Sequence, residues 1–162
     1  MGAAEKRSLF DMAATSIDGK RIALSKWRGR VVLVVNTASQ CGNTPQYAGL
    51  QEIWERYRTR GLVVLGFPSN DFDHQEPGDE ADIKKFCSLT YGVTFPLFAK
   101  VVTHGVGQSP VYQFLSAKHG VPEWNFHKYL VGKDGQVVRA FRPAVQPDDA
   151  ELRGAIEGAL AR

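Results

Sequence analysis

Two continuous apolar runs constrain the fold of this chain more than any other feature of its sequence. They read VVLVVNTA at residues 31–38 and LVVLGFPS at residues 62–69. Neither run alternates with polar residues, so each is expected to be a strand covered on both faces of a sheet. Between them, apolar side chains recur at helical spacing, at Tyr47, Leu50, Trp54 and Tyr57. Gly61 then supplies a helix stop signal. Strand, helix and strand in this order predict two parallel strands joined by a right-handed crossover.

Shorter patterns predict further strands outside this unit. Asp-Gly turn signals at residues 18–19 and 134–135 lie between short strand patterns, so each predicts a β-hairpin. The second hairpin is expected within residues 126–141. Residues 94–100, TFPLFAK, are expected to form a short strand that Pro96 interrupts.

Three more helices are expected after the second apolar run. One should begin near Asp79 and extend to about Tyr91. Its apolar positions lie on one helical stripe, at Ile83, Phe86, Cys87 and Tyr91. Residues 109–118 are expected to form a helix with Pro110 in its first turn. A closing helix is indicated by apolar side chains at four-residue intervals, at Leu152, Ile156 and Leu160.

These elements predict one thioredoxin-like α/β domain over residues 1–162, with a mixed central sheet flanked by helices and a β-hairpin near the N-terminus. The length suits a single hydrophobic core. The sequence contains no repeat, linker or low-complexity segment that would divide it.

Composition and charge argue against several classes of protein. Hydrophobic residues make up 43% of the chain and charged residues 23%, which is typical of a globular domain. No apolar run reaches the roughly 18 residues of a membrane span, and residues 1–20 lack the apolar stretch of a secretory signal. We therefore expect a cytoplasmic protein without stable membrane insertion. The net charge is +3, but the basic residues are scattered, so no nucleic-acid binding is expected.

The cysteines and histidines do not indicate a metal or a cofactor. The four histidines show no spacing typical of a zinc site, and neither of the two cysteines belongs to a CxxC pair. Two cysteines in a chain of this kind point away from a structural disulfide framework, which leaves core packing or redox chemistry.

Cys41 follows the first apolar run, where the chain is expected to turn into a helix. In open α/β sheets, ligand chemistry occurs at the carboxyl ends of the parallel strands. The free amides and partial positive charge of a helix N-terminus would stabilise a thiolate there. The alternative is a small buried residue that fills a turn. The surrounding polar sequence, SQCGNTPQ, favours a partly accessible site.

A lowered thiol pKa alone would not make Cys41 a fast nucleophile. Lowering the pKa by about two units raises the thiolate fraction at neutral pH about 25-fold. Intrinsic nucleophilicity falls about 8-fold over the same shift, which leaves a gain of only about 3-fold. Each donor aimed at developing negative charge can add about a hundredfold. Candidate donors are Gln75, in the loop after the second run, and Trp124 and Asn125, before a predicted strand. Taken singly, they could be a solvated glutamine, a packed tryptophan and a turn-capping asparagine.

Taken together, these segments resemble the glutathione peroxidase family, in particular its small non-selenium members that accept electrons from thioredoxin. The similar stretches are NTASQCGNTPQYAGL, GFPSNDFDHQEPG, FCSLTYGVTFPLFAK and WNFHKYLVGKDG, in family order. The resemblance covers essentially the whole chain. It implies that Cys41 is the peroxidatic residue and that Gln75, Trp124 and Asn125 complete a catalytic tetrad. Cys41 would attack a hydroperoxide, release water or an alcohol and become a sulfenic acid.

The same resemblance implies that Cys87 is the resolving cysteine. It would condense with the sulfenic acid at Cys41, and thioredoxin, rather than glutathione, would reduce the internal disulfide. The alternative is that Cys87 only packs on the apolar stripe of its helix. Because a disulfide needs Cα atoms within about 7 Å, a resolving role requires that helix to unwind in part.

Some positions depart from the family pattern. Gln40 stands where a lysine is common, and Ser69 where many relatives carry a third cysteine. Asp71, Asp73 and His74 replace a commoner uncharged loop around Gln75, which adds local negative charge. These departures bear on how strongly the Cys41 thiolate is stabilised.

The stretch between Tyr112 and Trp124 lacks the longer insertion of tetrameric relatives, so the resemblance implies a monomer. Its open site would admit bulky hydroperoxides as well as hydrogen peroxide. Two other functions share part of this chemistry. A thiol-disulfide oxidoreductase shares the fold, but the chain has no CxxC pair. A redox sensor or relay would use the same first step and then pass the oxidation to a partner protein.

Overall fold

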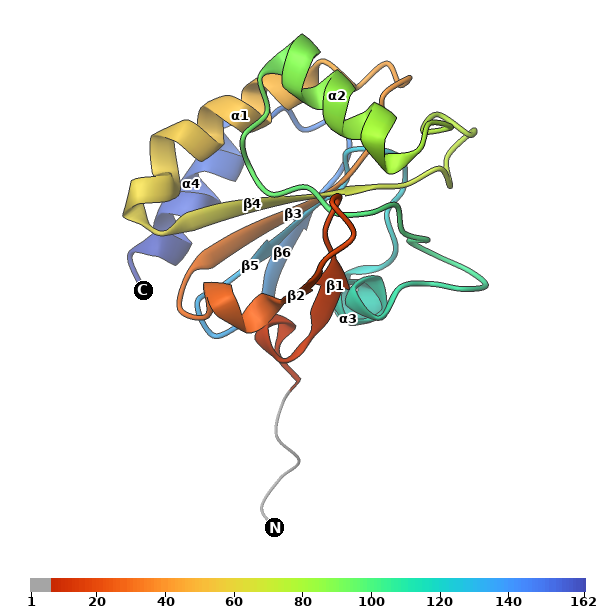
Figure 1. The fold of residues 1–162 in the computed structure, drawn as a ribbon. Helices are drawn as coiled ribbons and strands as arrows, with labels where there is room; N and C mark the ends of the chain where they lie inside the picture. Colours follow the sequence, from red (N-terminus) through yellow and green to blue (C-terminus); the bar gives the residue numbers. More distant parts are fainter. Residues whose placement is uncertain (1–6) are drawn as a thin grey trace.

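A four-stranded mixed sheet forms the centre of the molecule. The computed structural model describes residues 7–162. Its sheet has the strand order β4-β3-β5-β6 (Figure 1). The strands are β3 (Val31–Thr37), β4 (Leu62–Pro68), β5 (Lys128–Val131) and β6 (Val137–Phe141). β3 and β4 are parallel, whereas β5 is antiparallel to both β3 and β6.

The two apolar runs form the adjacent strands β3 and β4, as predicted. Val31 lies opposite Leu62, and the register continues to Thr37 opposite Pro68. Every residue of both strands is buried, which is why neither run alternates with polar side chains. The carboxyl ends of these strands therefore lie side by side at one edge of the sheet.

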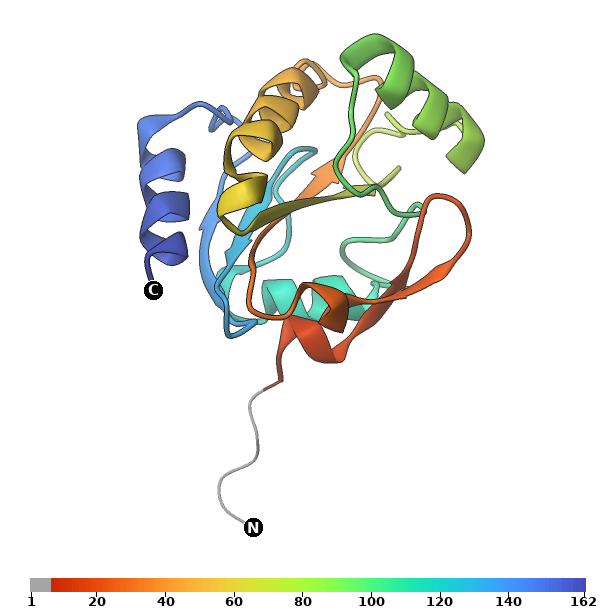
Figure 2. The ribbon, with the colours of Figure 1, turned by 60° about the vertical axis from the view of Figure 1, so that its left-hand side comes forward.

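Helices cover both faces of the sheet, as Figures 1 and 2 show. They are α1 (Gln46–Tyr57), α2 (Glu80–Tyr91), α3 (Pro110–His119) and α4 (Ala150–Leu160). Val31, Leu33 and Val35 of β3 point into the core that contains α1, α2 and α4. The alternate residues Val32 and Val34 point into the core that contains α3. This alternation follows from the two-residue period of a strand.

The N-terminal hairpin consists of β1 (Ala13–Thr15) and β2 (Arg21–Ala23), and the predicted turn at residues 18–19 joins them. Three short 3₁₀ helices are η1 (Leu9–Asp11), η2 (Leu24–Trp27) and η3 (Arg58–Arg60). η1 packs against the β5–β6 turn, where Leu9 N donates to Gly135 O over 3.0 Å. Gly135 has φ +81°, and a Cβ there would lie 1.9 Å from Ser8 Oγ, so the turn requires glycine.

Helix α2, which carries Cys87, has a defined cap at each end. The Asp79 side chain accepts a hydrogen bond from Asp82 N, and the Asp82 side chain accepts one from Asp79 N. This capping box satisfies two amide donors in the first turn. Gly92, with φ +60°, ends the helix. The predicted bounds of this helix are confirmed.

The strand predicted at residues 94–100 is wrong. This segment makes only isolated bridges, Gly66 to Leu97 and Ser16 to Phe98. Pro96 has no amide to donate, and Gly66 bonds to both Pro96 O and Phe98 N, so the ladder stops there.

Among residues 7–162, no helix has both the length and the apolar character needed to span a membrane.

Candidate active site

Cys41 lies in a turn that follows β3, and α1 begins at Gln46. The expectation that Cys41 starts the helix is therefore wrong by one turn and a half. Residues 41–46 form successive tight turns, in which Thr44 N donates to Cys41 O and Gln46 N donates to Asn43 O. Pro45 sets the start of the helix because its fixed φ suits the first helical turn.

The Cys41 loop, residues 38–45, is held by a threonine and presents a donor to the sulfur. Thr44 Oγ1 accepts from Cys41 N over 2.9 Å and donates to Ala38 O over 2.8 Å. Asn43 N donates to Cys41 Sγ over 3.3 Å. Cys41 is half-buried, which fits a reactive site better than a core position.

Gln75 is joined directly to the residue before Cys41. Gln40 N donates to Gln75 O over 3.0 Å, so the loop after β4 is tied to the Cys41 loop. Asn125, which is fully buried, donates its Nδ2 to Gln75 Oε1 over 2.9 Å. This bond fixes the glutamine amide with its oxygen toward Asn125. The two N–H groups of Gln75 are therefore directed elsewhere.

Trp124 packs against the loop that carries Gln75. Its ring centroid lies 5.3 Å from that of Phe72, and 38% of the residue is exposed. Asn36 Nδ2 donates to Trp124 O over 3.0 Å, and Phe126 N donates to Asn36 O over 2.6 Å. Phe126 has φ +69°, an unfavourable conformation for a non-glycine residue, and the two bonds to Asn36 hold the segment in it.

Asn36 is a positioning residue that the sequence analysis missed. It is fully buried at the end of β3, and it binds the backbone on both sides of Asn125. A polar residue that ends a continuous apolar strand was the available signal. The structure therefore brings the segments of Cys41, Gln75 and the Trp124–Asn125 pair to one edge of the sheet.

Cys87 is fully buried on α2, in the core against which Cys41 packs. Both cysteines are free thiols. Burial raises the pKa of the Cys87 thiol to about 11, although the adjacent Tyr47 hydroxyl acts in the opposite direction. Cys87 is therefore a protonated core residue in this state.

Asp71, Asp73 and His74 shape the loop that carries Gln75. The Asp71 carboxylate accepts from Thr103 Oγ1 over 2.7 Å and from Thr103 N, so it anchors the loop. Asp73 and His74 both have positive φ, which marks a tight turn just before Gln75. No group of three or more His, Cys, Asp or Glu side chains in residues 7–162 is arranged to hold a metal ion.

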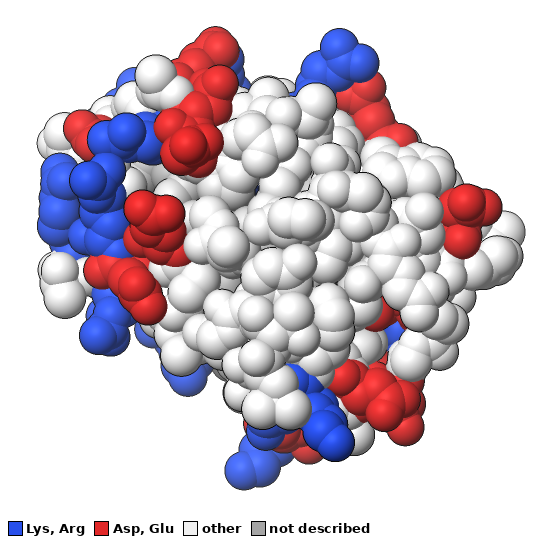
Figure 3. All heavy atoms as spheres, turned by 90° about the horizontal axis from the view of Figure 1, so that it is seen from above, with Lys and Arg blue, Asp and Glu red and all other residues white. Residues whose placement is uncertain are grey.

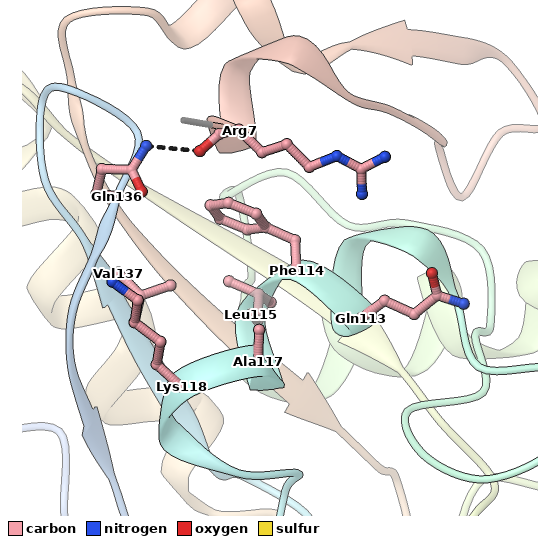
Figure 4. A pocket seen from close by; sticks show the side chains of 8 residues that line it. All are labelled: Arg7, Gln113, Phe114, Leu115, Ala117, Lys118, Gln136 and Val137. Carbon is pink, nitrogen blue, oxygen red and sulfur yellow. Dashed lines mark hydrogen bonds between the residues drawn. The ribbon is translucent and has the colours of Figure 1, made fainter. Parts of the chain in front are cut away.

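The surface offers two further features. The segment that precedes α1, orange in Figure 1, lies at the top of that view. Seen from above, the broad middle of the molecule carries no charged side chains, and charges gather at its margins (Figure 3). An apolar pocket lies elsewhere, between α3, β6 and Arg7 (Figure 4). Phe114, Leu115 and Val137 line it, and none of its residues belongs to the site.

Comparisons with known proteins agree with this geometry. Residues 9–116 match the family described as "Glutathione peroxidase". "Hydroperoxy fatty acid reductase gpx1" of Synechocystis sp. is 44% identical over 160 residues, covering 92% of this chain and 95% of the relative. "Thioredoxin/glutathione peroxidase BtuE" of Escherichia coli is 40% identical over 180 residues, covering 96% and 98%. A solved structure, "Crystal structure of Trgpx in apo form", is 31% identical with a TM-score of 0.79, covering 97% and 98%.

These comparisons establish the fold and the family of the chain. The fold is thioredoxin-like, as predicted. The chain belongs to the glutathione peroxidase family, and it is an enzyme of the peroxidase type.

Proposed function

We propose that this chain reduces hydrogen peroxide and organic hydroperoxides with Cys41, and that an internal disulfide to Cys87 is then reduced by thioredoxin. Two hydrogen bonds support the proposed reduction of peroxide by Cys41. Hydrogen bonds join Asn125 to Gln75, and Gln75 to the residue before Cys41. These bonds tie the two segments that carry Gln75 and Asn125 to the loop that carries the half-buried Cys41 thiol.

In the first step, the Cys41 thiolate attacks the nearer oxygen of the hydroperoxide. The S–O bond forms as the O–O bond breaks, the sulfur is oxidised to a sulfenic acid, and the leaving oxygen departs as water or an alcohol after gaining a proton. Gln75, Trp124 and Asn125 supply or position uncharged N–H donors for the sulfur and the leaving oxygen. Because they carry no charge, burying them costs less than burying a lysine or an arginine.

The second step requires α2 to move. With a pKa of about 11, about one Cys87 thiol in ten thousand is ionised at pH 7. The side chain is also fully buried in the core against which Cys41 packs, so we infer that it leaves its position on α2 to reach the Cys41 sulfur. Partial unwinding of α2 would bring the thiol out of the core and restore its ordinary pKa. Cys87 would then react only after the helix opens.

The proposed reductant is thioredoxin, and the proposed substrates include bulky hydroperoxides. Two cysteines on neighbouring segments suit a dithiol reductant such as thioredoxin better than glutathione, and the Escherichia coli relative is named for both reductants. The broad uncharged surface suits a lipid or alkyl hydroperoxide, and the Synechocystis relative is named for fatty acid hydroperoxides. We propose that the protein acts as a monomer in the cytoplasm.

A coupled assay tests this function. Peroxide consumption is measured over many turnovers with thioredoxin, thioredoxin reductase and NADPH, and separately with glutathione. We expect sustained turnover with thioredoxin, none in Cys41→Ser, and a single oxidation without turnover in Cys87→Ser. Normal cycling of Cys87→Ser with thioredoxin would assign Cys87 to core packing alone. One oxidation of the wild type without turnover would favour the redox relay.

A further inference from the structure

A buried carboxyl lies beside the Cys41 loop, and the reaction described so far does not use it. Glu76 is 1% exposed. Within residues 7–162, its Oε2 atom accepts no hydrogen bond, and neither does the buried hydroxyl of Ser39 nearby. A buried carboxyl without full hydrogen bonding is costly, so its presence calls for an explanation.

Glu76 lies between the two segments that carry the cysteines. It lines a pocket of about 430 Å³ together with Ser39 and Gln40 of the Cys41 loop and with Ile83 and Phe86 of α2. Cys87 directly follows Phe86 and packs with Ile83 in the same core. The pocket therefore separates the Cys41 loop from the helix turn that precedes Cys87.

Glu76 is fixed to the side of the pocket that does not need to move. Lys100 Nζ donates to Glu76 O over 3.3 Å, and Asn70 Oδ1 accepts from Glu76 N over 2.9 Å. The preceding residue, Gln75, is bound to Gln40. α2 begins only at Glu80, so the helix can open while the Glu76 backbone stays in place.

We propose that Glu76 accepts the proton of Cys87 and delivers it to the hydroxide that leaves Cys41 during disulfide formation. This inference rests on the proposed function. The Cys87 thiol gives its proton to the Glu76 carboxylate, and its sulfur attacks the sulfenic sulfur. The new S–S bond forms as the S–O bond breaks, which oxidises the Cys87 sulfur and reduces the Cys41 sulfur. The leaving hydroxide takes the proton from Glu76, which yields water and restores the carboxylate.

The electrostatic surroundings of Glu76 suit this exchange. Burial raises the pKa of its carboxyl, whereas the nearby Ser39 and Lys100 lower it. The carboxylate in turn adds to the raised pKa of Cys87. Tyr47 and Asp82 are the other titratable groups around the pocket and its core. A carboxyl with a pKa closer to neutrality is a better proton carrier than a solvated one.

The test separates disulfide formation from the oxidation of Cys41. Reduced protein is mixed with one equivalent of hydrogen peroxide, quenched at intervals with an alkylating agent, and analysed by mass spectrometry for sulfenic acid and disulfide. Glu76→Gln keeps the size of the side chain but cannot carry the proton. We expect disulfide formation at pH 7 to slow about a hundredfold, with the rate of Cys41 oxidation unchanged.

Glu52→Gln is the matched control, because it makes the same change of side chain at an exposed position of α1 that lies outside the site. Both of its rates should match the wild type. Equal slowing of disulfide formation in the two variants, or no slowing in Glu76→Gln, would overturn the role of Glu76. A wild type that forms no disulfide would overturn the proposed function as well, so the two failures are distinguishable.

The pH dependence of the wild type provides a measurement that needs no variant. With Glu76 as the base, the rate of disulfide formation rises with pH through the pKa of this carboxyl and then levels off. If hydroxide alone removes the proton, the rate rises tenfold per pH unit up to the thiol pKa. Such a continuous rise would contradict the proposal even if Glu76→Gln failed to fold.

Discussion

Replacing Asn125 with Asp reverses one hydrogen bond at the centre of the site while keeping the size of the side chain. Asn125 Nδ2 donates to Gln75 Oε1 over 2.9 Å in a fully buried position. A carboxylate cannot donate, so Gln75 must turn its amide and present N–H to residue 125. The Gln75 oxygen would then point where the two Gln75 N–H groups point in the wild type. An acceptor in place of a donor opposes the negative charge that develops on sulfur and oxygen.

The expected effect is about a hundredfold slower oxidation of Cys41, the usual consequence of losing one donor at a developing charge. Stability should fall by about 1 to 3 kcal/mol because a charged carboxylate is buried where a neutral amide stood. The assay is stopped-flow oxidation by hydrogen peroxide in a Cys87→Ser background, with a denaturant melt alongside. Asn70→Asp is the matched control, because Asn70 Oδ1 accepts from Glu76 N and Asp keeps that role. Wild-type oxidation in Asn125→Asp, or equal slowing in both variants, would refute the reasoning.

Three further predictions concern α2, pH and the disulfide. Asp79→Ala removes the α2 cap and should destabilise the protein by about 1 kcal/mol, which lowers the melting temperature. Rapid-quench alkylation should also show faster disulfide formation once Cys41 is oxidised. Slower formation would argue against helix opening. Burial lowers the pKa of His127 to about 4, so the unfolded chain binds the extra proton between pH 6.5 and 4. Stability should therefore fall as pH falls through that window, and urea melts of His127→Gln should show a weaker fall; an identical pH dependence would contradict this cause. Closing the loop from Cys41 to Cys87 would by itself stabilise the chain by about 4 kcal/mol, but unwinding α2 offsets this, so calorimetry should find the oxidised and reduced forms close in stability. A gain near the full loop value would contradict the unwinding.

The architecture was predictable because its signals are local. The continuous apolar runs predicted β3 and β4, and the Asp-Gly turns predicted both hairpins. The segment at residues 94–100 has the apolar content of a strand, but Pro96 lacks the amide that a ladder needs, so it forms only bridges. The turn around Cys41 was predicted as helix because nothing in SQCGNTPQ shows that Thr44 bonds back to Ala38.

Individual site residues could be predicted from the sequence, but the hydrogen bonds that join them could not. Gln75 and Asn125 were identified as donors, yet the bond between them joins residues far apart in the sequence and cannot be derived from a local pattern. The positioning role of Asn36 and the burial of Glu76 were missed for the same reason, because their partners come from other segments. A polar residue near the end of an otherwise apolar buried strand, as at Asn36 in β3, is the signal that the sequence offers.

The central claim is that placed donors, rather than a lowered thiol pKa, make Cys41 reactive toward peroxide. The most direct test compares two rates for Cys41 in the Cys87→Ser protein at pH 7, one with iodoacetamide and one with hydrogen peroxide, each relative to free cysteine. Alkylation depends on thiolate content and access, whereas peroxide reduction also needs donors for the leaving oxygen. The account predicts an acceleration with peroxide at least about a hundredfold greater than with iodoacetamide. Equal acceleration of both reactions would contradict it.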